Sequence, residues 1–327
     1  MNIPAPPERL MPLRRPALII SSLSLLVILT VGPACDFGKH SQRAPNVEIE
    51  GDGSWYKGSN EEKEYLLKTF PAEGEKTIPW PPEELRRYVD ISVDVTKSSF
   101  SSVILYRGKK ISWAEYNIRK FSEYLVKEHV LLPGDRITLR IFGSKPNSQE
   151  MSQDQSLDIA NPPLQVKIKA DVYTNRYNDR HLQVAKVWSD TPDGEKETVN
   201  TIEEWCLKQI GKEIYTKSPL LNHMANVKRN TDSKKGKRVL IFITDAHIDF
   251  ENLYFSPAHY SDELVAGIRK GVEELNLKPF DNPDPNVSII IFGLNYQGDE
   301  RFRLKQQELL RWFFDKQDPQ LVTLIVS

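Results

Sequence analysis

The sequence predicts an α/β fold, in which a doubly wound, mostly parallel sheet is flanked by helices. Two continuous apolar runs, at 237–244 and 287–292, indicate strands that are buried on both faces, as the strands of a parallel sheet are. Segments whose apolar residues recur at helical spacing lie between the predicted strands. This alternation is typical of the crossover connections in a parallel sheet.

The predicted elements begin at Tyr88. Residues 88–94 form the first strand, and apolar residues from Ala114 to Leu125 recur at helical spacing after it. A Pro-Gly-Asp turn at 133–135 leads into a second strand at 136–142. The later elements are a helix around Trp205, a helix that begins near Ser218, the strand 237–244, a helix capped by Ser261, the strand 287–292, a helix at 304–314 and a last strand at 321–326.

Residues 143 to 200 fit the alternation less well. They contain proline and asparagine turns and two strand-like runs, at 164–172 and 181–187. We expect an insertion, an elaborated hairpin with loops at the edge of the sheet. The predicted domain therefore covers residues 87–327, with the insertion at about 143–200.

The N-terminus has the pattern of an export signal. Arg14 and Arg15 precede an apolar stretch at 17–31, and small residues follow it. The stretch is shorter than the roughly 20 residues that a membrane-spanning helix needs. We therefore predict that residues 1–34 are a signal peptide and that the mature protein is extracytoplasmic.

The segment Gly32-Pro33-Ala34-Cys35 resembles the lipobox of bacterial lipoproteins. The resemblance implies that Cys35 is acylated and anchors the protein to a membrane of the cell envelope. One alternative is an ordinary signal peptide cut after Ala34, which gives a soluble secreted or periplasmic protein; another is a signal-anchor helix. Residues 35–86 are predicted to form a flexible tether, since they are rich in Gly, Ser, Lys and Glu and end in a proline-rich stretch.

Composition and charge narrow the functional classes. The chain has 327 residues, of which 39% are hydrophobic and 27% charged, as in an ordinary globular protein. Its 44 Lys and Arg residues against 45 Asp and Glu leave a net charge of −1, which gives no electrostatic case for binding nucleic acid. No Walker-type phosphate loop, Gly-x-Ser-x-Gly elbow or His-Glu-x-x-His pair occurs. We expect a binding protein and not an enzyme.

Two aspartates stand where predicted parallel strands end. Asp94 closes the first strand and Asp245 follows the strand 237–244, and ligands of open α/β sheets bind beyond such carboxyl ends. Asp94, Thr96 and Ser98 alternate along one loop, so they can present one carboxylate and two hydroxyls to the same point. Oxygen ligands of this kind suit Mg²⁺, Mn²⁺ or Ca²⁺ and not zinc.

From residue 88 onward, the chain resembles a von Willebrand factor type A (VWA) domain with its metal-ion-dependent adhesion site. The first motif of that family, Asp-x-Ser-x-Ser, matches Asp94, Thr96 and Ser98 with threonine at the first serine position. The second motif is a threonine at the start of a later helix. Ser218, which precedes Pro-Leu, fits that position, and Thr216 is the alternative.

The third motif is an aspartate after an apolar strand, which Thr244-Asp245 matches, although Ala246 stands where the family commonly has glycine. The resemblance implies that Mg²⁺, or else Mn²⁺ or Ca²⁺, is bound by Thr96 and Ser98 directly. It implies that Asp94, Ser218 and Asp245 bind directly or through water. The ion keeps a position open for a carboxylate of a protein or peptide ligand. The expected function is thus that of an exported, lipid-anchored binding module.

Three alternatives remain open from the sequence. The same fold could serve as a scaffold with an empty metal site. Asp94 and Asp245 could instead cap neighbouring loops through backbone N–H groups, as aspartates often do. A metal-dependent phosphoryl hydrolase could use Asp94 as its nucleophile, although such phosphatases need a second aspartate two residues later, where Thr96 stands.

Overall fold

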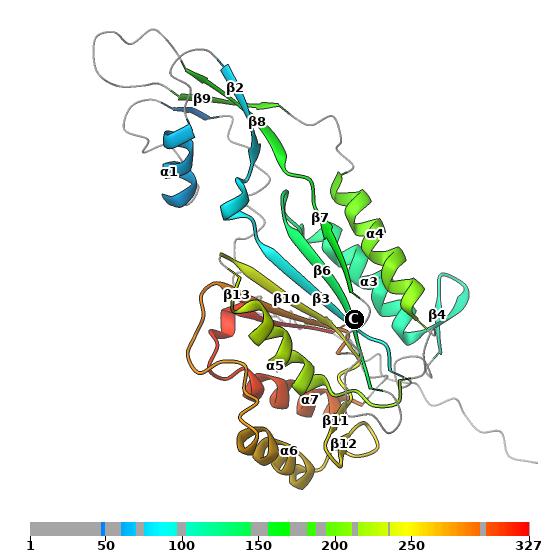
Figure 1. Ribbon diagram of the computed structural model, residues 1–327. Helices are drawn as coiled ribbons and strands as arrows, with labels where there is room; N and C mark the ends of the chain where they lie inside the picture. Colours follow the sequence, from blue (N-terminus) through cyan, green and yellow to red (C-terminus); the bar gives the residue numbers. More distant parts are fainter. Residues whose placement is uncertain are drawn as a thin grey trace, which may run out of the picture.

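The computed structural model describes residues 47–49, 60–69, 75–96, 103–144, 156–170, 182–187, 194–210, 215–234, 236–294 and 299–326 (Figure 1). The predicted signal peptide, Cys35 and Ser98 lie outside these residues. Among the helices that are described, none is both long and apolar enough to cross a membrane.

A six-stranded sheet forms the centre of the molecule, in the order β14-β13-β10-β3-β6-β7. Neighbouring strands are parallel except at β7, which pairs antiparallel with β6 and forms one edge. The strands are β3 (Tyr88–Asp94), β6 (Arg136–Phe142), β7 (Ser156–Ala160), β10 (Arg238–Ile243), β13 (Val287–Phe292) and β14 (Val322–Ile325). The sheet is therefore mostly parallel, as the sequence predicted.

Helices cover both faces of this sheet (Figure 1). One hydrophobic cluster joins the central strands to α3 (Trp113–Lys127) and α4 (Gly194–Gln209). A second cluster joins them to α5 (Leu220–Thr231), α6 (Asp262–Glu274) and α7 (Glu300–Phe313). The mixed α/β class that the sequence predicted is confirmed.

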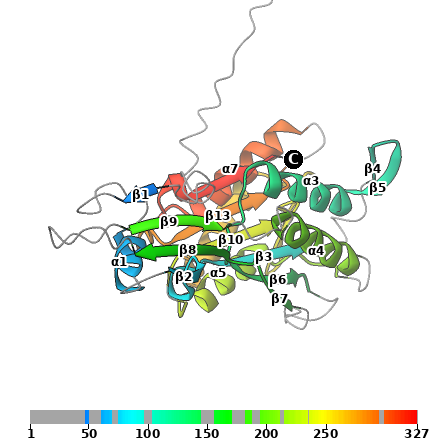
Figure 2. The same cartoon turned by 90° about the horizontal axis from the view of Figure 1, so that it is seen from above.

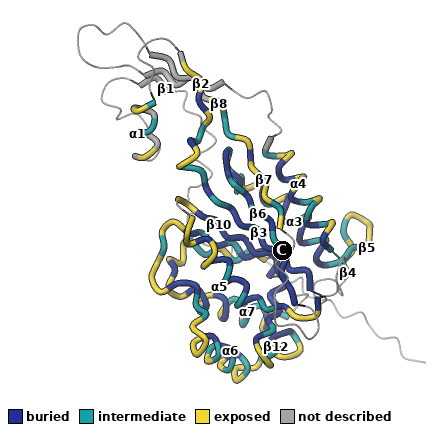
Figure 3. The backbone as a smooth tube through the Cα atoms, viewed as in Figure 1, coloured by how far each residue is buried: buried dark blue, intermediate teal, exposed yellow. Residues whose placement is uncertain are grey.

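The central strands are apolar throughout because they contact helices on both sides. Every residue of β10 is buried, and Figure 3 shows that burial is concentrated in this strand and its neighbours. Alternate residues of β10 enter the two clusters: Leu240 and Phe242 face α5, whereas Ile241 faces α3. Successive side chains of a strand point to opposite faces of the sheet, and both faces of β10 are covered by helices. All its residues are therefore apolar or buried, which explains the continuous hydrophobic run in the sequence.

Helix starts follow local capping chemistry. The side chain of Ser112 accepts a hydrogen bond from the backbone N–H of Glu115 and begins α3, and Ser261 begins α6 in the same way. α7 begins earlier than the predicted 304–314, because Asp299 accepts from the N–H of Phe302. An aspartate in this position also interacts favourably with the positive end of the helix dipole.

The insertion differs from the predicted edge hairpin. Its two strand-like runs form β8 (Leu164–Ala170) and β9 (Leu182–Val187), which pair antiparallel with each other. They do not extend the central sheet. They belong to a second sheet of order β1-β9-β8-β2, which Figure 2 shows from above. The edge of the central sheet is formed by β7, which lies within the predicted insertion and pairs antiparallel with β6, so this part of the insertion is at the edge as expected.

The predicted tether is also corrected, because part of residues 35–86 is folded. This part contains β1 (Val47–Ile49), α1 (Asn60–Thr69), β2 (Glu75–Trp80) and a short 3-10 helix, η1 (Glu83–Leu85). β2 pairs antiparallel with β8, with Ile78 opposite Val166 and Trp80 opposite Leu164. In β2, the alternating apolar residues are Ile78 and Trp80. These two residues are too few for the period of a strand to be recognised in the sequence.

Two small hairpins were not predicted. β4 (Val103–Tyr106) and β5 (Lys109–Ser112) form one, between β3 and α3. β11 (Ile248–Phe250) and β12 (Leu253–Phe255) form the other, directly after β10. A second 3-10 helix, η2 (Pro319–Leu321), precedes β14. Both hairpins follow the carboxyl end of a parallel strand, so they belong to the edge of the sheet where ligands bind in this class of fold.

Candidate metal centre

The candidate site lies where β3 and β10 end next to each other. The two strands pair in parallel with Val93 opposite Ile243, so the residues that follow, Asp94 and Thr244, emerge side by side. The chain segment before α5 meets them, since Thr96 forms a parallel bridge with Tyr215. Three segments that are distant in sequence thus meet at this edge of the central sheet.

The carboxylate of Asp94 is the centre of the contacts, and the residue as a whole is 2% exposed. Its Oδ1 accepts from the backbone N–H of Thr96 at 3.0 Å and from the Thr96 hydroxyl at 2.6 Å. Its Oδ2 accepts from the Ser218 hydroxyl at 2.9 Å and from the Thr244 hydroxyl at 2.8 Å. Hydroxyls from three segments therefore converge on one buried carboxylate.

Ser218, and not Thr216, is the residue that reaches the site. Thr216 is exposed, whereas Ser218 is 1% exposed and donates to Asp94. Asp249 on β11 fixes its position: the N–H of Ser218 donates to Asp249 Oδ2 at 2.6 Å, and the N–H of Asp249 donates to the Ser218 carbonyl at 2.8 Å. Between the two candidates for the second motif, the geometry therefore favours Ser218.

Asp245 is the second buried carboxylate. Its side chain is 1% exposed, and its Oδ1 accepts from the backbone N–H of His247 at 3.1 Å. Its Oδ2 is buried and accepts no hydrogen bond from the described residues, and Nδ1 of His247 is 3.7 Å away, beyond hydrogen-bond distance. Gln306 on α7 holds the loop by donating to the backbone carbonyl of Asp245 at 2.9 Å.

The two carboxylates repel each other in this buried place. Burial, and next the negative charge of Asp245, raise the pKa of Asp94 to about 7, although hydrogen bonds from Thr96 and Thr244 oppose the shift. Two acids with like charge that are kept out of water favour a cation between or beside them. The electrostatics of the site therefore suit a positively charged partner.

The residues present fit a hard divalent cation. A buried carboxylate oxygen needs a partner, and because Oδ2 of Asp245 finds no donor among the residues that the structure describes, an ion or a water molecule can fill this role. Among the described residues, no group of three or more His, Cys, Asp and Glu side chains could hold a metal ion. An ion at this site would therefore depend on hydroxyl oxygens beside the two carboxylates, which is a donor set for Mg²⁺, Mn²⁺ or Ca²⁺.

Of the predicted site residues, Asp94, Thr96, Ser218 and Asp245 are brought together, and Ser98 lies outside the described residues. Sequence reasoning did not assign a contact to the Thr244 hydroxyl, although its place directly before Asp245 was a usable signal. The contacts of Asp249 and Gln306 carried no local signal, since both act across the tertiary structure.

A chain of buried polar groups continues beneath the site along β3. Ser92 lies two residues before Asp94, and its hydroxyl is 2.8 Å from Nε2 of His223 on α5. The His223 ring stacks on Phe142 with 4.5 Å between the ring centroids, and burial lowers the pKa of His223 to about 3, so the ring is neutral. Below it, Arg140 pairs with Asp90 at 2.8 Å. The contact between Ser92 and His223 fixes α5 against β3, and so fixes Ser218 relative to Asp94.

Gly143 allows the close packing of the loops around the site. It follows β6 with φ +154°, and a Cβ atom added there would lie 2.9 Å from Cβ of Tyr215 and 3.3 Å from Cγ2 of Thr96. Tyr215 is 2% exposed and pairs with Thr96, so neither neighbour can move away freely. A side chain at this position would separate the Thr96 loop from the segment that carries Ser218.

Replacing Gly143 by alanine is expected to lower the free energy of unfolding by about 1–3 kcal/mol, through backbone strain and overpacking. Gly236→Ala is the matched control: φ is +90°, but the nearest atom to the added Cβ would be 3.8 Å away. Urea unfolding of both variants separates steric from backbone effects. Equal losses in the two variants would contradict a tight approach at Gly143.

Comparisons with known proteins give no assignment by sequence: no family model and no curated protein matches the chain. Among solved structures, the manganese-loaded TRAP protein of Plasmodium vivax is similar, at 9% identity and a TM-score of 0.29, covering 77% of this chain and 71% of that one. The open conformation of the pilus adhesin SpaC of Lactobacillus rhamnosus GG is similar at 10% identity and a TM-score of 0.36, covering 78% of this chain and 30% of that one.

The human COPII-coat protein Sec24c is a third similar structure, at 8% identity and a TM-score of 0.33. The match covers 78% of this chain and 32% of that one. The chain thus spans about a third of the length of the second and third structures. Similarity at this level does not assign the chain to a family.

Proposed function

We propose that this protein is an extracytoplasmic binding module that holds a divalent cation at the edge of its central sheet and uses it to engage a carboxylate of a protein or peptide ligand. One observation carries the proposal. Two buried carboxylates, Asp94 and Asp245, lie together with hydroxyls from separate segments, and Oδ2 of Asp245 accepts no hydrogen bond within the part of the chain that the structure describes. The earlier resemblance to VWA domains with an adhesion site agrees with this reading.

Binding suits the site better than catalysis. Both oxygens of Asp94 accept hydrogen bonds, so this carboxylate is not exposed as a nucleophile or a general base. Apart from the two carboxylates, the oxygen atoms available to bind an ion belong to neutral hydroxyls. Such ligands would leave a divalent ion with much of its positive charge. When bound, such an ion would supply electrostatic attraction for a carboxylate of another molecule. Mg²⁺ is the ion that we propose, with Mn²⁺ and Ca²⁺ as alternatives.

The cellular location is proposed from the N-terminal sequence. A basic start, an apolar stretch and small residues before Cys35 support export followed by acylation of that cysteine. The protein would then be held at a membrane of the cell envelope by its lipid. Mass spectrometry of the mature N-terminus tests this part: a diacylated or triacylated Cys35 supports it, and an N-terminus that starts unmodified contradicts it.

The ion part is tested with Mn²⁺, whose bound water is observed by proton relaxation. Ser218→Ala is expected to weaken Mn²⁺ binding by roughly 10- to 100-fold, because it removes a buried hydroxyl of the site. Thr216→Ala is the matched control, since Thr216 is exposed and two residues away. A short aspartate-containing peptide should then displace water from the protein–Mn²⁺ complex and lower the relaxation enhancement.

A second candidate is a scaffold with the same fold that binds no ion. It is favoured by the saturation of Asp94, whose carboxylate already accepts four hydrogen bonds. In that case the wild-type protein would show no Mn²⁺ binding, and Ser218→Ala would change only its stability. Mn²⁺ binding without any response to the peptide would contradict the proposed use of the ion for ligand binding.

A further inference from the structure

The β4–β5 hairpin exposes aliphatic side chains that the fold itself does not use. Among the described residues, Leu105 is the most exposed large hydrophobic side chain at 72%, followed by Val103 at 60%. In the register of the hairpin, Leu105 lies opposite Lys110 and Val103 lies opposite Ser112. Opposite residues of an antiparallel pair point to the same side. One side of the hairpin therefore presents two aliphatic residues and a lysine to solvent.

The hairpin is held firmly by its other side. The hydroxyl of Tyr106 donates to Glu123 on α3 at 2.7 Å, and Arg107 pairs with the same oxygen at 2.8 Å. The rings of Tyr106 and Tyr116 contact edge to face, with 5.5 Å between their centroids. These contacts with α3 hold the hairpin in one conformation, so less conformational entropy is lost when a partner binds to its exposed side.

The hairpin is also positively charged. Arg107 pairs with Glu123, but Lys110 on the exposed side and Lys109 on the other side are exposed and have no acidic group within ion-pair distance in the described part of the chain. No acidic residue occurs from Val103 to Ser112. An exposed lysine on the same side as two exposed aliphatic residues, in a hairpin without acidic residues, indicates a partner that carries both negative charge and apolar side chains.

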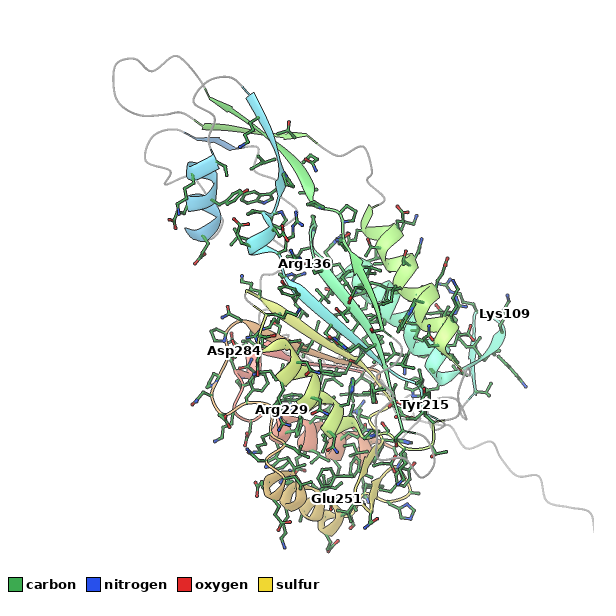
Figure 4. All side chains as sticks on the ribbon, in the orientation of Figure 1. Lys109, Arg136, Tyr215, Arg229, Glu251 and Asp284 are labelled. Carbon is green, nitrogen blue, oxygen red and sulfur yellow. The ribbon has the colours of Figure 1, made fainter. Side chains whose placement is uncertain are left out.

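The hairpin belongs to the same edge of the sheet as the candidate metal centre. The chain leaves this edge at Asp94, forms the hairpin, and returns along α3, which begins at Trp113. Figure 4 labels Lys109 on the hairpin and Tyr215, which pairs with Thr96 at the site. A ligand that approaches this edge of the sheet therefore faces both the site and the hairpin.

We infer that the exposed side of the β4–β5 hairpin is a second contact surface for an acidic, aliphatic-containing segment of the protein ligand. This inference rests on the proposed function, because the same ligand would supply the carboxylate for the ion. The aliphatic residues favour a polypeptide over a membrane: they lie on one side of the strands, whereas the turn that joins the strands, Arg107-Gly108, carries no apolar side chain. Binding at a membrane surface grows with the apolar area that is buried in the lipid, and two aliphatic side chains supply little of it.

The test uses a displayed peptide library with one fixed aspartate between randomised positions, selected on the wild-type protein with Mg²⁺. We expect the enriched peptides to carry further acidic residues and aliphatic residues near the fixed aspartate. The double variant Leu105→Gln with Lys110→Glu should bind a synthetic enriched peptide at least about 10-fold more weakly, with its Mn²⁺ affinity unchanged. The matched control is Leu275→Gln with Lys270→Glu, where both residues are also exposed; Lys270 lies on α6 and Leu275 is its C-cap residue.

Several outcomes would overturn the inference. If the hairpin variant binds the enriched peptides as tightly as the wild type, the hairpin is not a contact surface. If phosphatidylglycerol vesicles bind through the hairpin and no peptide is enriched, the surface serves a membrane. Both results leave Mn²⁺ binding intact, whereas a wild-type protein that binds no Mn²⁺ would refute the proposed function itself.

Discussion

Replacement of Asp94 by asparagine is expected to abolish divalent-ion binding without a loss of stability in the ion-free protein at about pH 8. The reason is that Asp94 is buried beside Asp245, and both burial and this neighbour disfavour its charge. The neutral amide keeps the size of the side chain and removes the repulsion. Melting temperatures with and without Mg²⁺ check this prediction: the wild type should gain stability from Mg²⁺, and the variant should not.

Two controls distinguish this result from simple misfolding. Glu251→Gln removes an exposed acid at the turn between β11 and β12, so it should leave the response to Mg²⁺ unchanged. Asp135→Asn alters a buried carboxylate whose partner is Arg87 at 2.6 Å, and it should destabilise the protein with and without Mg²⁺. If Asp94→Asn destabilises the ion-free protein as Asp135→Asn does, then Asp94 is a structural cap and not an ion ligand.

The sequence identified the elements whose pattern is local. β3 and β6 have the predicted bounds because each lies between a turn signal and a polar loop, and their apolar residues are buried against helices. The second sheet could not be predicted, although β8 alternates between apolar and polar residues and was recognised as a strand-like run, because its partner β2 lies far away in the sequence. Which strands pair at such a distance depends on tertiary structure, and β2 has too few apolar residues to show a period.

In the candidate site, too, some residues could be predicted from the sequence and others could not. Asp94 and Asp245 could be recognised because strand ends of a parallel sheet share one edge, and that geometry follows from fold class alone. The contact between Ser218 and Asp249 could not be recognised, because it depends on how the β11–β12 hairpin packs against the start of α5. The choice between Ser218 and Thr216 required the same information, since one is buried and the other is exposed.

The affinity for Mg²⁺ is expected to rise by roughly tenfold per pH unit up to about pH 7 and to level off above it. The ion requires ionised Asp94, whose pKa is raised to about 7 by burial and by Asp245. Below that pH, binding must displace a proton. Isothermal titration calorimetry across this range measures the affinity. Two buffers with different ionisation enthalpies give the number of protons released, which should approach one per ion at low pH.

The ion-free protein should respond to pH in the opposite direction. A carboxyl group whose pKa is higher in the folded state than in the unfolded state binds more protons when folded. Asp94 therefore stabilises the fold most below about pH 4, and this contribution is lost as the pH rises to about 7. Asp90 and Asp135 also have raised pKa values because they are buried, so the difference between wild type and Asp94→Asn isolates the Asp94 contribution. A Mg²⁺ affinity that is constant from about pH 5 to 8 would mean that no buried acid of this kind takes part in binding the ion.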